Sequence, residues 1–458
     1  MDLHPFVILV VGIGVVMGLI LALRMNAFIA LTVAAFTISL LAPGELATKI
    51  TRVATAFGSV AGSIGIVIAL AAVIGKAMMD SGAAERIVMA ILGRLGEKRA
   101  PFALMASGYT LSIPVFFDTV FYLLIPLARS LWLKSRRNYL QFVCAIVAGA
   151  AVTHSMVPPT PGPVFMAAAL DVDFGLLLLV GGVIGIPMAL VGLAVSGWLD
   201  RRMPIDMRPY AGEDLDTPAE QRALPPLWLA LSPVVLPVLL ISANTFASAL
   251  AGPADAMTAT AARVVGWAAI LGNPNFALLL SAAISLYMVA RYRGRSLAEL
   301  SSDTEHALMS GGVIILITAA GGAFGAMLRE AGIQEPIQAM MGGSGGAGIG
   351  VLISAALVAS LIKFAQGSGT VSMITTSSMF AAMGFSAATL DFNPVYLACV
   401  IGAGSLIGDW MNNSGFWVFA KMGGFTTEET LRSWTILTAS VGITGVIVTI
   451  VASMVLPL

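Results

Sequence analysis

Long apolar runs recur along the whole chain, and short polar loops separate each run from the next. Three of the clearest runs cover residues 6–23, 176–198 and 434–456. At a rise of ~1.5 Å per residue, each run is long enough to cross a hydrocarbon layer ~30 Å thick. The pattern therefore predicts an all-α polytopic membrane protein.

The composition supports this interpretation. The chain is 58% hydrophobic and only 10% charged, whereas a soluble domain usually carries about a quarter charged residues. Residues 1–5 contain no Lys or Arg and no small-residue cleavage pattern follows, so the first apolar run is expected to remain as a membrane helix.

Other partners are not expected from the sequence. Cys144 and Cys399 both lie in apolar stretches, so we expect neither a disulfide, a metal site nor a cofactor. The net charge is zero and basic residues occur only in short loop clusters, which gives no reason to expect nucleic acid.

Positive residues gather in four loops, whereas the loops at 171–173, 332–350 and 385–393 lack Lys and Arg. Because an excess of Lys and Arg marks cytoplasmic loops, we expect the four basic loops to share the inner face. The clusters are Arg86, Arg94, Lys98 and Arg99; Arg129, Lys134, Arg136 and Arg137; Arg201, Arg202, Arg208 and Arg222; and Arg291, Arg293 and Arg295.

Two apolar segments are predicted to be hairpins. Residues 101–133 have a basic cluster at both ends, and Pro114 supplies the helix break that a re-entrant hairpin needs. A single long crossing is the alternative, and it would place one basic cluster outside. Residues 351–383 lie between loops without Lys or Arg and carry the polar stretch 366–370, which predicts a second hairpin that enters from the outer face.

The two halves of the chain resemble each other. Residues 62–87 align without gaps onto residues 312–337, with seven identical positions. In each half a predicted hairpin then precedes an interrupted helix, which covers 138–170 in the first half and 394–420 in the second. The identical pairs are Gly62 and Gly312, Ile64 and Ile314, Ala69 and Ala319, Gly75 and Gly325, Gly82 and Gly332, Glu85 and Glu335, and Ile87 and Ile337.

This order predicts two inverted repeats. About five full crossings plus one hairpin per half make an odd count, so the second half is expected to be inserted upside down. The first repeat would cover residues 1–200 and the second 226–458, joined by a polar cytoplasmic linker at 201–225. Interrupted helices at corresponding positions of inverted halves point to the binding site of a secondary transporter.

The breaks favour an anionic ligand, because each half-helix begins with unpaired amides at the positive end of its dipole. Polar and flexible residues at the breaks are therefore candidate substrate contacts, although each alone is more often a cap or packing residue. They are Thr119, Ser155, Thr160, Gln366, Gly367, Ser368, Gly369, Thr370, Asn412, Asn413 and Ser414.

Ionisable side chains at membrane depth are costly and need an explanation. Lys363 is the natural partner of an anion, and the alternatives are an internal salt bridge or snorkelling. Asp118 is a candidate substrate contact and proton carrier, or else a helix cap or ion-pair partner. His154 is the other candidate for proton coupling, unless it only orients its loop. Asp409 would coordinate a cation or substrate hydroxyls, or belong to a structural network.

Four stretches together carry a family resemblance: residues 115–126, 153–163, 367–371 and 402–417, the last ending in Ser-Gly-Phe-Trp. They resemble the gluconate permease family of the ion transporter superfamily, in order and over nearly the whole chain. The resemblance implies proton-coupled uptake of gluconate or related sugar acids across a bacterial inner membrane. It also implies relatives that take other hydroxy acids or D-serine, a homodimer, and a scaffold that holds an elevator-type transport domain with two hairpins.

The chain departs from the family pattern at the predicted site. Family members often have Glu in place of Asp118, His in place of Thr160 and Arg in place of Lys363. They also often have a His-x-Asn-Asp-x-Gly-Phe-Trp pattern where this chain has residues 409–417. The expected substrate is therefore a small hydroxycarboxylate, with gluconate as one example.

Other functions remain as alternatives. Sodium coupling within the same fold is the second hypothesis, because unwound carbonyls and hydroxyl oxygens also suit a cation. An intramembrane hydrolase would need a catalytic spacing that the sequence does not contain, so we do not expect an enzyme. A channel is a third alternative. Saturation of the solute flux and counter-exchange would distinguish a carrier from a channel.

Overall fold

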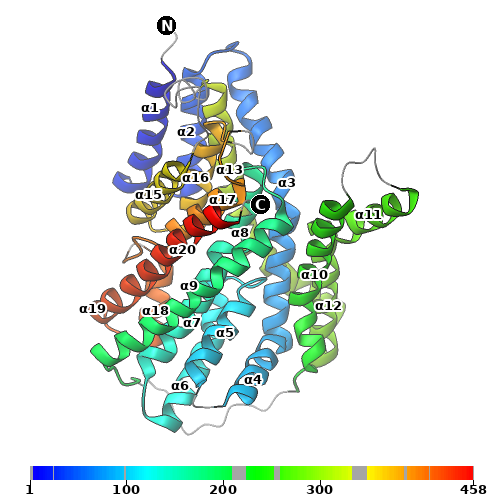
Figure 1. The fold of residues 1–458 in the computed structure, drawn as a ribbon, viewed down its shortest axis with the longest axis vertical. Helices are drawn as coiled ribbons and strands as arrows, with labels where there is room; N and C mark the ends of the chain where they lie inside the picture. Colours follow the sequence, from blue (N-terminus) through cyan, green and yellow to red (C-terminus); the bar gives the residue numbers. More distant parts are fainter. Residues whose placement is uncertain are drawn as a thin grey trace.

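The computed structural model describes residues 4–23, 25–96, 99–208, 223–251, 258–332, 348–385, 389–411 and 413–456. Over these residues the chain folds into helices (Figure 1). Among the described residues, seven helical stretches are long and apolar enough to cross a membrane. The predicted all-α membrane protein is therefore confirmed at this level.

The first half runs from α1 to α9. Its elements are α1 (Pro5–Met17), the π-helical turn η1 (Gly18–Ala22), α2 (Ala27–Leu41), α3 (Thr48–Ser81), α4 (Ala83–Leu95), α5 (Ala100–Leu111), α6 (Phe117–Ser135), α7 (Tyr139–Met156), α8 (Pro161–Ala169) and α9 (Phe174–Arg202).

The second half runs from α10 to α20. Its elements are α10 (Leu227–Ala251), α11 (Ala259–Leu271), α12 (Pro274–Arg293), α13 (Leu297–Glu330), α15 (Ile349–Gln366), α16 (Gly369–Ala382), α17 (Pro394–Gly404), α18 (Ser414–Gly423), α19 (Thr427–Thr430), the π-helical turn η4 (Leu431–Thr435) and α20 (Ile436–Val455).

Local sequence signals set several helix starts. The side chains of Asn26, Asn273 and Asn393 each accept a hydrogen bond from the backbone amide two residues later, at the starts of α2, α12 and α17. Ser296 and Glu299 form a capping box at the start of α13. Gly82 ends α3 with a φ of +80°, which an L-residue rarely adopts.

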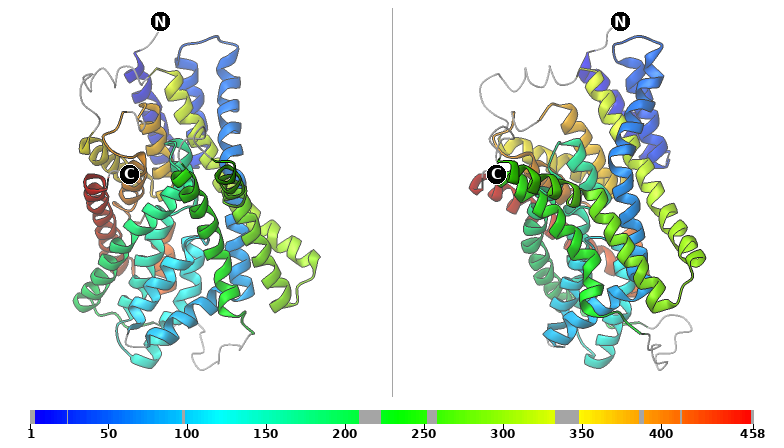
Figure 2. Two further views of the ribbon diagram at one scale, coloured as in Figure 1. Left: turned by 45° about the vertical axis from the view of Figure 1, so that its right-hand side comes forward. Right: turned by 90° about the vertical axis from the view of Figure 1, so that its right-hand side faces the viewer.

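The two longest helices, α3 and α13, have 34 residues each and lie side by side (Figure 2). Arg52 at the start of α3 forms an ion pair of 3.7 Å with Glu330 at the end of α13. At the opposite end, the contact is made by Arg293, the last residue of α12, which lies shortly before the start of α13. Its Nε donates a hydrogen bond of 2.8 Å to the carbonyl oxygen of Asp80, near the end of α3. The two helices are therefore antiparallel along their whole length.

The long helix of each half is also packed against a helix of the other half. α2 packs against α13 of the second half, and α12 packs against α3 of the first half. α10, α11 and α12 form a group that lies beside α3, at the right of Figure 1. In this group, α12 packs directly on the long antiparallel pair, and α10 and α11 pack on α12.

Both predicted hairpin segments contain two helices joined by a short break. In 101–133, α5 and α6 are separated by residues 112–116. In 351–383, α15 and α16 are separated by residues 367–368. The segments 138–170 and 394–420 are also divided, with breaks between α7 and α8 and between α17 and α18.

Glycines let the backbones of these helices approach closely. A Cβ on Gly149 of α7 would lie 2.0 Å from the carbonyl oxygen of Met105 on α5. A Cβ on Gly404 of α17 would lie 2.7 Å from the carbonyl oxygen of Ala356 on α15. Each hairpin is therefore packed closely against the broken helix that follows it. Across the halves, α16 packs against α8 and α18 packs against α6, which brings the breaks together.

The described parts of the four basic loops lie toward one end of the molecule, which is the lower end in Figure 1 and is called the basic end below. Within the linker segment 201–225, Arg208 forms a bidentate ion pair of 2.7 Å with Glu429. Arg129 donates a hydrogen bond of 3.1 Å to the carbonyl oxygen of Arg208. Residues 209–222 lie outside the described part of the chain.

Candidate functional site

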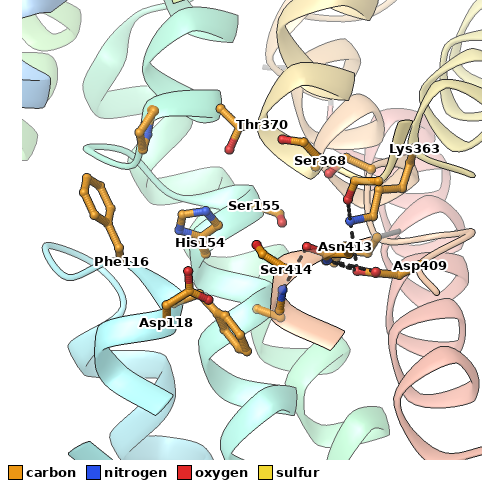
Figure 3. Close-up of a pocket in the computed structure, with 18 of the residues that line it drawn as sticks. Phe116, Asp118, His154, Ser155, Lys363, Ser368, Thr370, Asp409, Asn413 and Ser414 are labelled. Carbon is orange, nitrogen blue, oxygen red and sulfur yellow. Dashed lines mark hydrogen bonds and ion pairs between the residues drawn. The ribbon is translucent and has the colours of Figure 1, made fainter. Parts of the chain in front are cut away.

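A cavity of about 470 Å³ lies where the breaks of the two halves meet (Figure 3). Its volume falls in the range of ~300–1,000 Å³ that is usual for small-molecule sites. Its walls come from α6, α7, α8, α13 and α15–α18, with Trp434 from η4. The lining residues are Phe116, Phe117, Asp118, Ala151, His154, Ser155, Pro161, Ile314, Lys363, Gly367, Ser368, Gly369, Thr370, Ser405, Leu406, Asp409, Asn413, Ser414, Gly415 and Trp434.

The first turns of four helices line this cavity, namely α6, α8, α16 and α18. Side chains cap two of them: Ser368 accepts from the amide of Val371 at 3.3 Å, and Asn413 accepts from the amide of Gly415 at 3.0 Å. α6 and α8 begin without a side-chain cap. The cavity therefore receives the positive ends of four helix dipoles, which favours an anionic ligand.

A buried ion pair forms one wall of the cavity. Lys363 Nζ lies 2.9 Å from Asp409 Oδ2, and both side chains are 3% exposed. The same ammonium donates a hydrogen bond of 2.7 Å to the carbonyl oxygen of Gly367. Asn413 Nδ2 lies 2.8 Å from both carboxylate oxygens of Asp409. The network compensates for the desolvation of both charges, and it leaves Lys363 at the cavity surface.

Asp118 and His154 line the other side of the cavity (Figure 3). Asp118 is in the first turn of α6 and its side chain is exposed. His154 is in the last turn of α7, and its ring packs edge-to-face on Phe116 at 6.4 Å. Within the described residues, His154 Nδ1 is buried and has no hydrogen-bond partner. Both residues therefore bring ionisable side chains to this side of the cavity.

Hydroxyl groups add polar contacts around the same space. Ser155 is 4% exposed and follows His154 at the end of α7. Ser368 and Thr370 come from the second hairpin, and Ser414 begins α18. A polyhydroxylated ligand would find donors and acceptors on several walls.

Some predicted site residues do not line this cavity. Thr119 lines a separate cavity of about 380 Å³ between α3, α6 and α13. Thr160 is 1% exposed, and its hydroxyl donates a hydrogen bond of 2.6 Å to the carbonyl oxygen of Val157. The side chain of Gln366 and the whole of Asn412 lie outside the described part of the structure.

Aromatic residues line the cavity without having been predicted from the sequence. Trp434 is 2% exposed and packs on Phe117 with ring centroids 5.7 Å apart. It belongs to the π-helical turn η4, and such turns are frequent at functional sites. Phe116 and Phe117 flank the break before α6, so their position beside Pro114 was the available signal.

The described charged residues at the cavity are one lysine, Lys363, and two aspartates, Asp118 and Asp409. When both aspartates are ionised and His154 is neutral, these groups sum to one negative charge in excess. No group of three or more His, Cys, Asp or Glu residues that would hold a metal ion is found in the described part of the chain.

Comparison with known proteins gives a consistent result. The inner membrane permease YgbN of Escherichia coli is 31% identical over 451 residues, which cover 95% of this chain and 96% of that protein. A gluconate permease of Pseudomonas aeruginosa is 29% identical over 461 residues, with 99% of each chain covered.

The fold also has a solved counterpart. The structure of MtrF from Neisseria gonorrhoeae, described as one of a class of antimetabolite efflux pumps, has a TM-score of 0.65 and 17% sequence identity. The similarity covers 94% of this chain and 94% of that chain. At this identity the likeness concerns the fold alone.

The chain is a multi-pass protein of the bacterial inner membrane and a transporter rather than an enzyme. The sequence model of the GntP family permeases matches residues 4–455, which is nearly the whole chain. The protein therefore belongs to the GntP permease family.

Proposed function

We propose that this protein is a secondary active transporter that carries a small hydroxycarboxylate, such as gluconate, together with protons. The observation that carries the proposal is the cavity between the broken helices, with four helix N-termini and the ammonium of Lys363 on its walls. Its hydroxyl groups suit a polyol chain. A relative at 29% identity is named a gluconate permease, which supports this substrate class.

The charges at the cavity support proton coupling. An anionic substrate adds a second negative charge to a site that already has one in excess, and this is costly at low dielectric. Protonation of Asp118 or His154 removes that cost, because both line the cavity opposite the Lys363–Asp409 pair. Substrate and proton would then favour each other's binding, which is the thermodynamic basis of symport.

The architecture supports an inverted repeat with an elevator-type movement. α3 and α13 correspond in length and order and run in opposite directions. We assign α2, α3, α12 and α13 to the scaffold, and the hairpins with their broken helices to the transport domain. A homodimer held together through the scaffold belongs to the same proposal.

Reconstituted liposomes test the proposal. Purified protein should accumulate labelled gluconate when an inward proton gradient is imposed without sodium, and unlabelled gluconate should drive counter-exchange. Uptake that follows a sodium gradient and ignores pH would replace the proton by sodium. If no hydroxycarboxylate or sugar acid of a panel is transported, the proposed substrate class is wrong.

A further inference from the structure

The second cavity lies directly behind one wall of the first. It has a volume of about 380 Å³ and is formed by α3, α13 and the start of α6. Phe116 lines both cavities, so its side chain is part of the partition between them. The lining residues are Ala71, Ala72, Gly75, Lys76, Val115, Phe116, Thr119, His306, Ala307 and Met309.

The two cavities follow one another along α13. Ile314 lines the first cavity and His306 lines the second. Their separation in sequence corresponds to roughly 12 Å along a helix. His306 is nearer to the start of α13, where Arg293 meets the end of α3. The second cavity therefore lies toward the basic end, which the excess of Lys and Arg assigns to the cytoplasm.

The partition consists of the break before α6. Val115 is 1% exposed, and the backbone of Pro114 and Val115 lies against Gly75, where an added Cβ would be 3.4 Å from the carbonyl oxygen of Pro114. On the side of the main cavity, the ring of Phe117 packs against Trp434. Phe116 lies between these two anchored residues, is only partly buried and lines a cavity on each side, so it is the side chain that has to turn away from His154 to join the two cavities.

Two consecutive residues of α6 line different cavities. Asp118 lines the first cavity, and Thr119 lines the second. The second cavity also has the side chains of Lys76 and His306 on its wall. Lys76 is paired with Asp80 one helical turn away, and such partly exposed pairs are weak enough to exchange partners.

We propose that the second cavity is a transit site for the same anionic hydroxycarboxylate on its way to the cytoplasm, and that Phe116 separates it from the main site. This inference rests on the proposed transport function. Displacement of the Phe116 ring joins the two cavities, and the substrate then passes from Lys363 toward Lys76. Thr119 belongs to this transit site and not to the main site.

Chemical modification inside the second cavity tests the proposal. Cys144 and Cys399 are fully buried, so a Thr119→Cys variant presents a new reactive thiol. A membrane-impermeant methanethiosulfonate should label it in inside-out vesicles and not in right-side-out vesicles. Relative to the unlabelled variant, labelling should reduce the maximal rate of gluconate uptake by about tenfold or more without weakening gluconate binding.

The matched control is Ser301→Cys, on an exposed position of α13 that lines neither cavity. Its labelling from the same side should leave uptake unchanged. If labelled Thr119→Cys transports as well as the unlabelled protein, or if only the outer face gives labelling, the second cavity is not on the inward path.

A second measurement does not depend on gluconate. A Thr370→Cys thiol in the main cavity should react several-fold faster with reagent from the cytoplasmic side when Phe116→Ala is added. Equal reaction rates would show that Phe116 is not the partition. A wild-type protein that fails to bind any sugar acid refutes the proposed substrate, whereas this reaction rate still decides on the connection between the cavities.

Discussion

Lys363 and Asp409 form an ion pair of 2.9 Å in which both side chains are 3% exposed, at the wall of the central cavity. The pair joins the last turn of α15 to the break after α17. Substitution of either residue therefore acts on both stability and ligand binding, and the two effects must be separated.

Replacement of Lys363 should remove substrate binding and also destabilise the protein. Lys363→Met leaves Asp409 buried without its cation, which typically costs about 3–5 kcal/mol. The double variant Lys363→Met/Asp409→Asn should recover most of that stability but not the binding of gluconate. Thermal unfolding with and without gluconate measures both quantities. Gluconate binding by the double variant would show that the ammonium is not the anion contact.

Bulk at the tip of the second hairpin should weaken substrate binding. A Cβ on Gly369 would lie 3.9 Å from Lys363 Nζ and 3.5 Å from the carbonyl oxygen of Ser405, so Gly369→Val places methyl groups beside the ammonium. We expect gluconate affinity to fall by about tenfold or more, equivalent to ~1.4 kcal/mol. Gly350→Val on the outer part of α15, where an added Cβ has open space, is the matched control. Equal affinity in both variants would remove the hairpin tip from the site.

Asp118→Asn should uncouple transport from the proton gradient. The amide carries no charge at any pH, so it imitates the protonated carboxyl and binds the anion without taking up a proton. Counter-exchange of gluconate should persist, whereas accumulation driven by the proton gradient should be lost. Asp391→Asn in an exposed loop is the control and should accumulate normally. Retained accumulation in Asp118→Asn would leave His154 as the coupling residue, and His154→Gln then provides the next test.

Two cysteine pairs distinguish the mobile part from the scaffold. A Cβ on Gly325 of α13 would lie 2.7 Å from the Cβ of Ser378 on α16, and a Cβ on Gly322 would lie 3.0 Å from the Cβ of Val60 on α3. Both distances require a small local shift to reach disulfide geometry. Oxidation of Gly325→Cys/Ser378→Cys should stop transport reversibly, and oxidation of Gly322→Cys/Val60→Cys should not. Equal effects of the two disulfides would contradict an elevator movement of α16 along α13.

The positions of the helix breaks were readable from the sequence, because Pro, Gly and polar residues at membrane depth interrupt helices for local reasons. The breaks around Pro114, at 157–160 and at 367–368 all lie inside the segments where they were predicted. Their convergence on one cavity is a tertiary feature. It brings Asp118, His154 and Lys363, which the sequence singled out separately as costly charges at membrane depth, to the walls of the same cavity.

The direction of individual side chains was not readable. Consecutive residues on a helix point about 100° apart, so Asp118 and Thr119 could not both be assigned to one cavity without the packing of α6. Thr160 satisfies its hydroxyl within its own turn. For Lys363, an anion contact, an internal salt bridge and snorkelling were open alternatives. The structure shows the salt bridge to Asp409 at the cavity wall, and the contact with an anion remains a prediction.

The buried ammonium and its partners Asp409 and Asn413 all belong to the second half of the chain, whereas Asp118 and His154 belong to the first. In the proposed mechanism, the group that recognises the anion and the groups that couple its movement to protons therefore lie in different halves of the chain. Under that mechanism, a substitution in one half changes the preferred solute and leaves the driving ion the same.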